Sequence, residues 1–321
     1  PIISESQLGC LVKTRDFQWR WQRFLIISNL ESKQMFKRVA IIGLGLIGGS
    51  IALSIKKHRL AKELIAWDID QDCLRKGAEL NMVDGFAETI RSAAIGAELV
   101  MLSVPVGEMR GVLEQIDLRD QIITDVGSVK GSFVEDVEAV FTKVPPRIIP
   151  GHPIAGSEKK GMGASEAGLF EGHSVILTPN EETDKNALEK VSKLWSLMGC
   201  KISIMSVQDH DTILAKTSHL PHLLSSVFSE SIYSEPDRAA ALAHAAGSFR
   251  DISRISASDP GIWTDIFLAN DLKLIESLEK FMIGLEKMKN KIASGDHSEV
   301  KRFLERGKIV REHFSSITKE L

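Results

Sequence analysis

The stretch Val39-Ala-Ile-Ile-Gly-Leu-Gly-Leu-Ile-Gly48 decides the fold of this chain. Its apolar start is typical of a strand buried on both faces, and it leads directly into a Gly-x-Gly-x-x-Gly pattern that opens a helix. Gly43 permits a tight turn, Gly45 lets the backbone approach a pyrophosphate, and Gly48 allows close contact between helix and strand. The pattern predicts a dinucleotide-binding loop made of Gly43, Leu44, Gly45, Leu46, Ile47 and Gly48. The alternative is a purely structural turn.

A carboxylate follows at the end of the next predicted strand. Asp68 lies about 20 residues beyond Gly48, where a carboxylate accepts both ribose hydroxyls of NAD and repels the 2′-phosphate of NADP. NAD is therefore the expected cofactor. Ser103, Val104 and Pro105 close another strand whose carboxyl end points at the same place. For Pro105 the alternative is that it simply starts a helix.

Continuous apolar runs recur along the chain with helix-length segments between them, beginning at Val39, Leu64, Leu99, Ile122 and Val175. This alternation predicts right-handed βαβ crossovers and a doubly wound parallel sheet, with ligands at the carboxyl ends of its strands. After Ser206 the strand-like runs stop, and long helical patterns follow from Gln208 to Ser234 and from Trp263 to Ile292. We expect an α/β fold with a sheet domain over residues 35–205 and an all-α domain over residues 206–321.

The composition is that of an ordinary globular chain. Its 321 residues, 43% of them apolar, suffice for about two domains. The formal net charge of -3 leaves no basic excess for a nucleic acid partner. Apolar runs such as Phe24 to Ile27 are far too short to span a membrane. The three cysteines are far apart, which argues against disulfides and a cysteine zinc site and favours a reducing cytoplasm.

Residues 1–34 differ in character from the rest of the chain. Aromatic side chains cluster there among arginines, and the periodic pattern begins only at Met35. We predict that Met35 is the natural start and that residues 1–34 are a disordered extension. The alternative is a short arm that packs on the sheet domain.

Two polar segments follow strand-like runs and should converge on the carboxyl edge of the sheet: Asp125-Val-Gly-Ser-Val-Lys130 and Gly151-His-Pro-Ile-Ala-Gly-Ser-Glu158. His152, between Gly and Pro, is suited to take a hydroxyl proton while hydride leaves the same carbon. Ser128 is suited to hold that hydroxyl by a hydrogen bond. The alternatives are a structural histidine and a serine that caps the helix beginning at Lys130.

The helical part carries two further polar segments: Ser218-His-Leu-Pro-His222 and Gly247-Ser-Phe-Arg-Asp-Ile-Ser-Arg254. The two histidines, with Asp209, His210 and Asp211 before them, are a conceivable metal-ligand set. We expect no metal, because Pro221 disturbs the helical spacing and hydride transfer needs none. Arg250 and Arg254 are four residues apart and are expected to face one cleft and bind carboxylates. The alternative is a solvated face with Asp251 as their ion-pair partner.

Taken in order, these segments resemble the prephenate/arogenate dehydrogenase family. The motifs that carry the resemblance are GLGLIGGS, DVGSVKG, GHPIAGSEKKG, SHLPH, GSFRDISRI and SDPGIWTDIF. The match is specific, because several distinctive motifs occur in the right order over essentially all of residues 36–321. It implies a Rossmann-type NAD-binding domain followed by a helical domain that mediates homodimerisation.

The resemblance also implies roles for single residues. His152 matches the family's catalytic histidine, and Ser128 matches the serine that orients the substrate hydroxyl. His219 matches a substrate-contacting histidine, and Arg254 matches the arginine that binds a substrate carboxylate. The remaining matches lie near the site entrance or close to the active site, in part across the dimer interface: Glu158, Asp251, Gly247 and Trp263.

The implied reaction is the NAD-dependent oxidative decarboxylation of prephenate to 4-hydroxyphenylpyruvate in tyrosine biosynthesis, with arogenate as the alternative substrate. A second alternative is a β-hydroxyacid dehydrogenase, but that class carries a Lys-x-x-x-Asn pair, and here Leu220 follows Lys216 at that spacing. A third is a non-catalytic NAD-binding sensor. No partner-binding module is evident in the sequence to support that third possibility.

Overall fold

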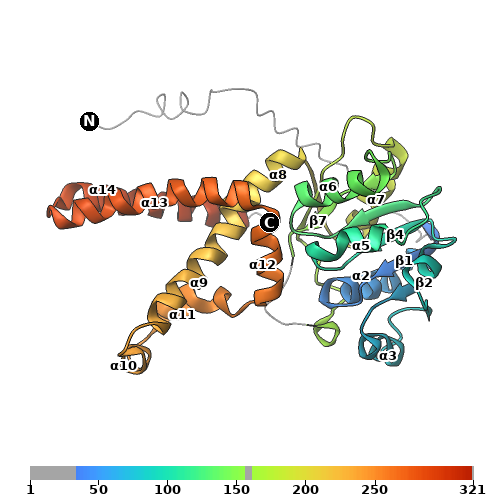
Figure 1. The fold of residues 1–321 in the computed structure, drawn as a ribbon, viewed down its shortest axis with the longest axis horizontal. Coiled ribbons are helices and arrows are strands. Elements are labelled where there is room, and N and C mark those ends of the chain that lie inside the picture. The colour runs from blue at the N-terminus through green and yellow to red at the C-terminus, as the bar shows by residue number, and fades with distance from the viewer. Residues whose placement is uncertain (1–33, 156–160, 320–321) are drawn as a thin grey trace. The chain divides into compact units, whose positions relative to one another are not determined.

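A six-stranded parallel sheet forms the centre of the first part of the chain (Figure 1). The computed structural model describes residues 34–155 and 161–319, so Glu158 and the predicted extension, except residue 34, lie outside the described residues. The strand order β3-β2-β1-β4-β5-β6 is the one in which a dinucleotide binds at the switch point. The strands are β1 (Phe36–Ile42), β2 (Ala61–Trp67), β3 (Gly85–Phe86), β4 (Leu99–Leu102), β5 (Ile122–Asp125) and β6 (Ile148–Ile149). The predicted doubly wound sheet is confirmed.

Both faces of this sheet are buried, as the continuous apolar runs predict. Along β1, Val39 and Ile41 belong to one buried cluster, whereas Ala40 and Ile42 belong to the other. Helices α2 and α7 contribute to the first cluster, and α4, α5 and α6 contribute to the second. The helices of this part are α2 (Leu46–Lys57), α3 (Gln71–Glu79), α4 (Ile90–Ala94), α5 (Met109–Leu113), α6 (Lys130–Phe141) and α7 (Lys185–Leu197), with short 3-10 turns η1 (Val106–Glu108) and η2 (Met162–Ala164).

The strand that begins near Val175 does not join this sheet, which corrects the prediction. It is β8 (Ser174–Leu177), the central strand of a second, three-stranded sheet with β7 (Gly151–Pro153) and β9 (Lys201–Ile204). β7 pairs antiparallel with β8, and β9 pairs parallel with it. Strand β6 ends at Ile149 because Pro150 follows, and proline has no N–H to extend the ladder.

A buried ion pair joins the two sheets to α6. Lys130, fully buried, donates from Nζ to the carboxylate of Asp125 at the end of β5 and to the carbonyl oxygen of Gly151 at 2.7 Å. The backbone N–H of Gly151 in turn donates to Asp125 Oδ1 at 3.0 Å. The end of β5, the start of α6 and the start of β7 are therefore held at one point.

From Val207 onward the described chain is helical. The elements are α8 (Val207–Leu214), the π turn η3 (Ala215–His219), α9 (Leu220–Tyr233), α10 (Arg238–Ala243), α11 (Gly247–Ser253), the 3-10 turn η4 (Arg254–Ala257), α12 (Pro260–Ala269), α13 (Asp271–Ala293) and α14 (His297–Lys319). Helices α13 and α14 run side by side as a hairpin (Figure 1).

Two predicted helices are interrupted, the first at a π turn before a proline and the second at a buried asparagine. The helix expected from Gln208 to Ser234 passes through the π turn just before Pro221, whose missing N–H leaves the ordinary hydrogen-bond ladder incomplete. The helix expected from Trp263 to Ile292 breaks at Asn270, which separates α12 from α13. The side chain of Asn270 is buried and donates to the carbonyl oxygen of Asp211 on α8.

The glycine loop generates a prediction about stability. A methyl group on Gly48 would lie 1.9 Å from the carbonyl oxygen of Gly43, whereas one on Gly45 would meet nothing within 4 Å. We expect Gly48→Ala to lower the free energy of unfolding by about 2 kcal/mol, because the strand and α2 must move apart. Urea denaturation measures this, and Gly45→Ala is the matched control. Equal stabilities of the two variants would contradict the packing argument.

Candidate active site

The glycine loop leaves open space at the N-terminus of α2. Gly43 has a φ of +94°, and a side chain there would also collide with the carbonyl oxygen of Ser103, 2.3 Å from the ideal Cβ position. Gly45 is the N-cap of α2 and brings no side-chain acceptor to the first N–H groups of the helix. These groups, with the space above Gly45, suit a phosphate. The structure thus brings the loop and Ser103 together, as predicted.

Asp68 lies at the carboxyl end of β2, directly beside the glycine loop. Its Oδ2 accepts from the Leu44 N–H at 2.5 Å, and its Oδ1 accepts from the Asp70 N–H at 2.8 Å. The two backbone donors orient the carboxylate and leave lone pairs for further donors. Val104 and Pro105 follow β4, and Pro105 directly precedes η1, so this proline also starts a helical turn.

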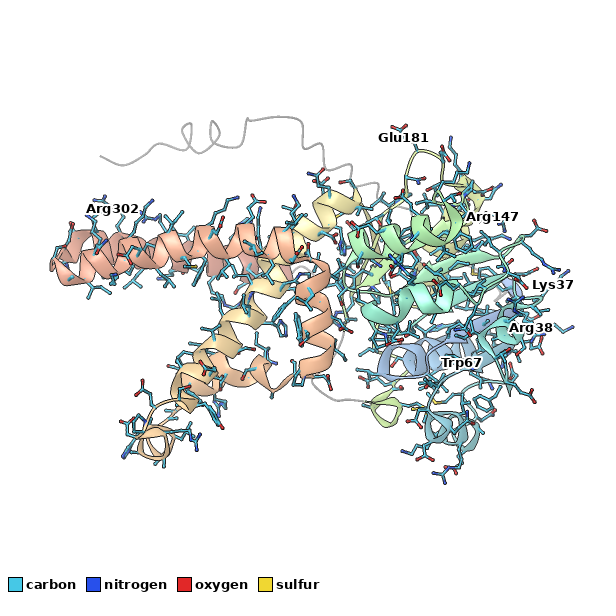
Figure 2. All side chains as sticks on the ribbon, viewed as in Figure 1. Lys37, Arg38, Trp67, Arg147, Glu181 and Arg302 are labelled. Atoms are coloured by element: carbon cyan, nitrogen blue, oxygen red, sulfur yellow. The ribbon has the colours of Figure 1, made fainter. Side chains whose placement is uncertain are left out.

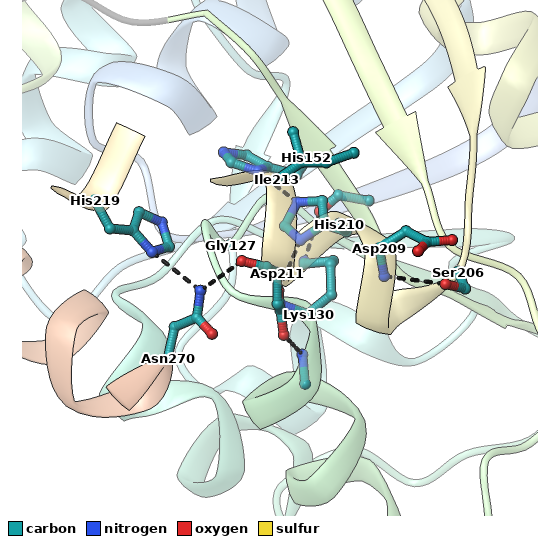
Figure 3. Close-up of polar contacts among 12 residues, drawn as sticks. Gly127, Lys130, His152, Ser206, Asp209, His210, Asp211, Ile213, His219 and Asn270 are labelled. Atoms are coloured by element: carbon teal, nitrogen blue, oxygen red, sulfur yellow. Dashed lines mark hydrogen bonds and ion pairs between the residues drawn. The ribbon is translucent and has the colours of Figure 1, made fainter. Parts of the chain in front are cut away.

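His152, the predicted proton acceptor, is buried. It lies on β7 and is 9% exposed. Its Nδ1 is 2.9 Å from Nε2 of His210, a fully buried residue of α8. His210 Nδ1 is 2.7 Å from Asp211 Oδ1. Figure 3 shows this continuous row of hydrogen bonds from Asp211 to His152. Neither His210 nor Asp211 was predicted to support His152, because they lie far from it in the sequence.

Asp211 also accepts hydrogen bonds from the first backbone N–H groups of α6. The backbone N–H groups of Lys130 and Gly131 donate to its two carboxylate oxygens at 2.9 and 2.7 Å. The alternative that Ser128 caps this helix is wrong: the N-cap residue is Val129, which has no side-chain acceptor, and Asp211 supplies the acceptor from a distant element. Ser128 itself is half-buried in the loop between β5 and α6, next to the buried pair Asp125–Lys130.

His219 is held by a residue that the sequence did not single out. It is the last residue of the π turn and is 1% exposed. The Asn270 Nδ2 atom lies 3.1 Å from His219 Nδ1 and 3.0 Å from the carbonyl oxygen of Asp211 (Figure 3). The His219 Nε2 atom is buried and has no hydrogen-bond partner among the described residues. No signal in the sequence pointed to Asn270, because it lies within a continuous helical pattern and its helix break is visible only in the structure.

Aromatic stacking places Trp263 beside two histidines. The His222 ring stacks on the Trp263 ring at a centroid distance of 3.5 Å and an angle of 18°, and the His219 ring meets it edge-on at 6.2 Å. Burial first, and then the positive charge of Arg254, hold the pKa of His222 below its ordinary value, although its hydrogen bond to the Ser218 carbonyl acts the other way. Trp263 and His222 therefore lie next to His219, and Arg254 is near enough for its charge to act on His222.

The remaining predicted residues lie on or near α11. Arg254 begins η4 directly after α11 ends at Ser253, so it does not continue the helix of Arg250. Asp251 and Gly247 are exposed. In the described part of the chain, no hydrogen bond or ring contact joins either of them to His152 or His219.

The buried histidines are held neutral by their surroundings. Burial, then repulsion from His210, Lys130 and His219, keeps the pKa of His152 well below its ordinary value. Burial also lowers the pKa of His210 against the opposing effect of Asp211, and it lowers the pKa of His219 to about 4. Burial raises the pKa of Asp211, but the hydrogen bonds from His210 and the α6 backbone outweigh it and leave that pKa below its ordinary value. At neutral pH the site holds neutral imidazoles and an ionised carboxylate.

Three further features of the described residues concern metal ligands, thiols and membrane-spanning helices. Among residues 34–155 and 161–319, no group of three or more His, Cys, Asp or Glu side chains is arranged to hold a metal ion. Within the same ranges, Cys73 and Cys200 are free thiols. In that part of the chain, no helix is both long enough and apolar enough to cross a membrane.

Comparison with known proteins finds one family along both parts of the chain. The profile of the prephenate dehydrogenase nucleotide-binding domain matches residues 51–204. The profile of the prephenate dehydrogenase dimerization domain matches residues 206–306.

Individual relatives agree with these profiles. A cyclohexadienyl dehydrogenase of Zymomonas mobilis is 36% identical over 291 residues, which are 89% of this chain and 95% of that protein. The crystal structure of prephenate dehydrogenase from A. aeolicus in complex with hydroxyphenyl propionate and NAD+ has a TM-score of 0.81 and 33% identity, covering 87% of this chain and 98% of that one. The structure of Synechocystis arogenate dehydrogenase has a TM-score of 0.72 and 27% identity, covering 86% and 99%. The chain therefore belongs to the prephenate dehydrogenase family.

Proposed function

We propose that this chain catalyses the NAD-dependent oxidative decarboxylation of prephenate to 4-hydroxyphenylpyruvate, a step toward tyrosine. The observation that carries the proposal is the neutral, buried His152 at the end of a row of hydrogen bonds that begins at Asp211. A neutral imidazole in this position is suited to remove a hydroxyl proton. Family membership and the names of the relatives support the choice of substrate.

The residues around the glycine loop fit NAD. The uncapped N-terminus of α2 and the open space at Gly45 suit the pyrophosphate, and Asp68 suits the adenosine ribose. Ile69 follows Asp68 and is 85% exposed, so it offers an apolar surface to the adenine ring. Ser103, Val104 and Pro105 would line the nicotinamide side. When bound, NAD supplies the acceptor for the hydride that leaves C4 of the substrate.

His152 and Ser128 act on the hydroxyl at C4. Ser128 holds this hydroxyl by a hydrogen bond, and His152 takes its proton as the C–H bond at C4 breaks. The carboxylate at C1 leaves as carbon dioxide, and its bonding electrons complete the aromatic ring and place negative charge on the C4 oxygen. The protonated imidazole of His152 returns its proton to this oxygen to give the phenol, and aromatisation makes the reaction effectively irreversible. The first proton transfer needs a neutral imidazole beforehand, which agrees with the lowered pKa of His152.

Substrate binding falls to the region around Trp263. His219 and Arg254 are proposed to bind substrate oxygens, with the aromatic face of Trp263 against the ring. His222 joins this set because its ring stacks on Trp263. Glu158, Asp251 and Gly247 are proposed to lie at the entrance, in part next to a second copy of the chain.

The helical part is proposed to form a homodimer. Helix α13 buries only Leu274 and Ser277, and no described residue of α14 is buried. Charged side chains such as Arg302 share these helices with many exposed apolar ones (Figure 2). The latter include Leu272, Ile275, Met282, Ile283, Leu285, Ile292, Leu304, Ile309, Val310 and Phe314. Sedimentation equilibrium should give the mass of two chains; a persistent single-chain mass would exclude the dimer.

The chain is proposed to consist of two domains and to work in the cytoplasm. The nucleotide-binding domain is taken as residues 35–205 and the helical domain as residues 206–321, since β9 ends at Ile204 and α8 begins at Val207. The widely spaced cysteines support a cytoplasmic location.

Formation of NADH by the purified protein tests the proposed function. We expect absorbance from NADH with prephenate and NAD, and at most weak turnover with NADP, because Asp68 repels a 2′-phosphate. Arogenate is the matched second substrate. Faster turnover of arogenate would favour the alternative function, and no turnover of either substrate in the presence of NAD would refute both.

Substitution of His152 should affect chemistry rather than binding. We expect His152→Asn to lower kcat by about 1000-fold, with little change in KM, because the proton acceptor is lost. Arg254→Gln is the contrast: it should raise KM about tenfold and leave kcat nearly unchanged, because a charged hydrogen bond to substrate is lost. Steady-state kinetics measures both, and wild-type turnover by the His152 variant would contradict its assignment.

The lowered pKa of His152 predicts an unusual pH dependence. Protonation removes the acceptor, so kcat falls on the acid side, and it falls only near the depressed pKa. We expect kcat to stay constant from about pH 8 down through 6.5, the ordinary pKa of histidine, and to decline only below that. A pH profile of kcat measures this. Half-maximal kcat near pH 6.5 would show that the pKa of His152 is not depressed.

A further inference from the structure

Asp211 reaches two histidines by two separate routes (Figure 3). Its carboxylate leads through His210 to His152, and its backbone carbonyl leads through Asn270 to His219. The donor and acceptor in each of these hydrogen bonds can be assigned by working outward from Asp211. Both the carboxylate of Asp211 and its backbone carbonyl oxygen can only accept hydrogen bonds.

The carboxylate route determines the tautomer of His152. Because the Asp211 carboxylate only accepts, His210 Nδ1, at 2.7 Å, carries the proton. A neutral imidazole has one N–H, so His210 Nε2 is an acceptor. His152 Nδ1, at 2.9 Å from it, must then donate. His152 is left with a bare lone pair on Nε2.

The carbonyl route determines the tautomer of His219. The Asn270 atom that lies 3.0 Å from the carbonyl oxygen of Asp211 must be the amide nitrogen, since two oxygens would repel each other. The same nitrogen lies 3.1 Å from His219 Nδ1, which therefore accepts. His219 carries its proton on Nε2, the buried atom without a partner among the described residues.

We propose that Asp211 sets the two histidines in opposite tautomers, so that His152 presents a proton acceptor and His219 presents a proton donor to the same substrate. His210 and Asn270 are positioning residues in this arrangement. The use of the two atoms rests on the proposed function: Nε2 of His152 takes the hydroxyl proton, and Nε2–H of His219 donates to a substrate oxygen. In serine proteases, loss of the corresponding control of a histidine tautomer lowers kcat about 10⁴-fold, so the effect is large enough to matter.

Nuclear magnetic resonance tests the tautomers without any substrate. Long-range correlation of ring protons with ¹⁵N in histidine-labelled full-length protein distinguishes protonated from bare ring nitrogens. Signals are assigned from their loss in His152→Asn and His219→Gln. At neutral pH we expect the proton on Nδ1 of His152 and on Nε2 of His219. A proton on Nε2 of His152, or on Nδ1 of His219, would overturn the proposal.

Two substitutions of His210 test the effect on catalysis. In His210→Gln the amide nitrogen can donate to Asp211 while the amide oxygen accepts from His152, so the tautomer is kept. In His210→Leu the acceptor is lost. We expect kcat to fall about 100-fold in the Leu variant and less than about tenfold in the Gln variant, with KM little changed in both. Asp209→Asn, two residues from Asp211 and outside both routes, is the matched control and should keep wild-type kcat.

The outcomes separate this inference from the proposed function. Equal kcat values for folded His210→Gln and His210→Leu would show that His210 only fills space, which overturns the positioning role. If His210→Leu does not fold, the tautomers in the wild-type protein and in His210→Gln still decide. If the tautomers are as expected and neither prephenate nor arogenate is oxidised, the proposed function fails while the inference about Asp211 stands.

Discussion

The first backbone N–H groups of α6 need an acceptor, and the way they obtain one organises the rest of the site. Helices α3, α4 and α7 begin after Asp70, Thr89 and Asp184, whose own side chains cap them. Helix α6 begins after Val129, so its N–H groups donate to Asp211 on α8. This link holds the first element of the helical part against the end of β5, and it brings His210 within hydrogen-bond distance of His152.

A buried positive charge next to this link helps to keep His152 unprotonated. Lys130 is fully buried and is compensated by Asp125 and by the carbonyl oxygen of Gly151. Such a pair is costly to desolvate and is tolerated only when its hydrogen bonds are satisfied. Its charge opposes protonation of His152, as does burial, which has the larger effect. The same group that joins the two sheets therefore helps to keep the proposed proton acceptor neutral.

Local patterns were sufficient to single out the residues proposed for cofactor binding and proton transfer. The glycine loop, Asp68 and His152 stand at positions that strand and turn signals identify. His210 and Asp211 were noticed only as candidate metal ligands. Asn270 was missed, because it lies within a continuous helical pattern. Their importance comes from hydrogen bonds to residues 58, 81 and 51 positions away, and no periodicity in the sequence reports such pairs.

By itself the sequence determined the doubly wound sheet, the helical second part and the glycine turn that opens α2, because each depends on the spacing of apolar residues and glycines over short stretches. Tertiary structure alone decided that β8 joins a second sheet, that Asp211 rather than Ser128 receives the start of α6, and that Asn270 interrupts a helix. The physical reason is common to all three. A buried hydrogen-bonding group takes whichever partner the folded chain brings near, and that partner need not be close in sequence.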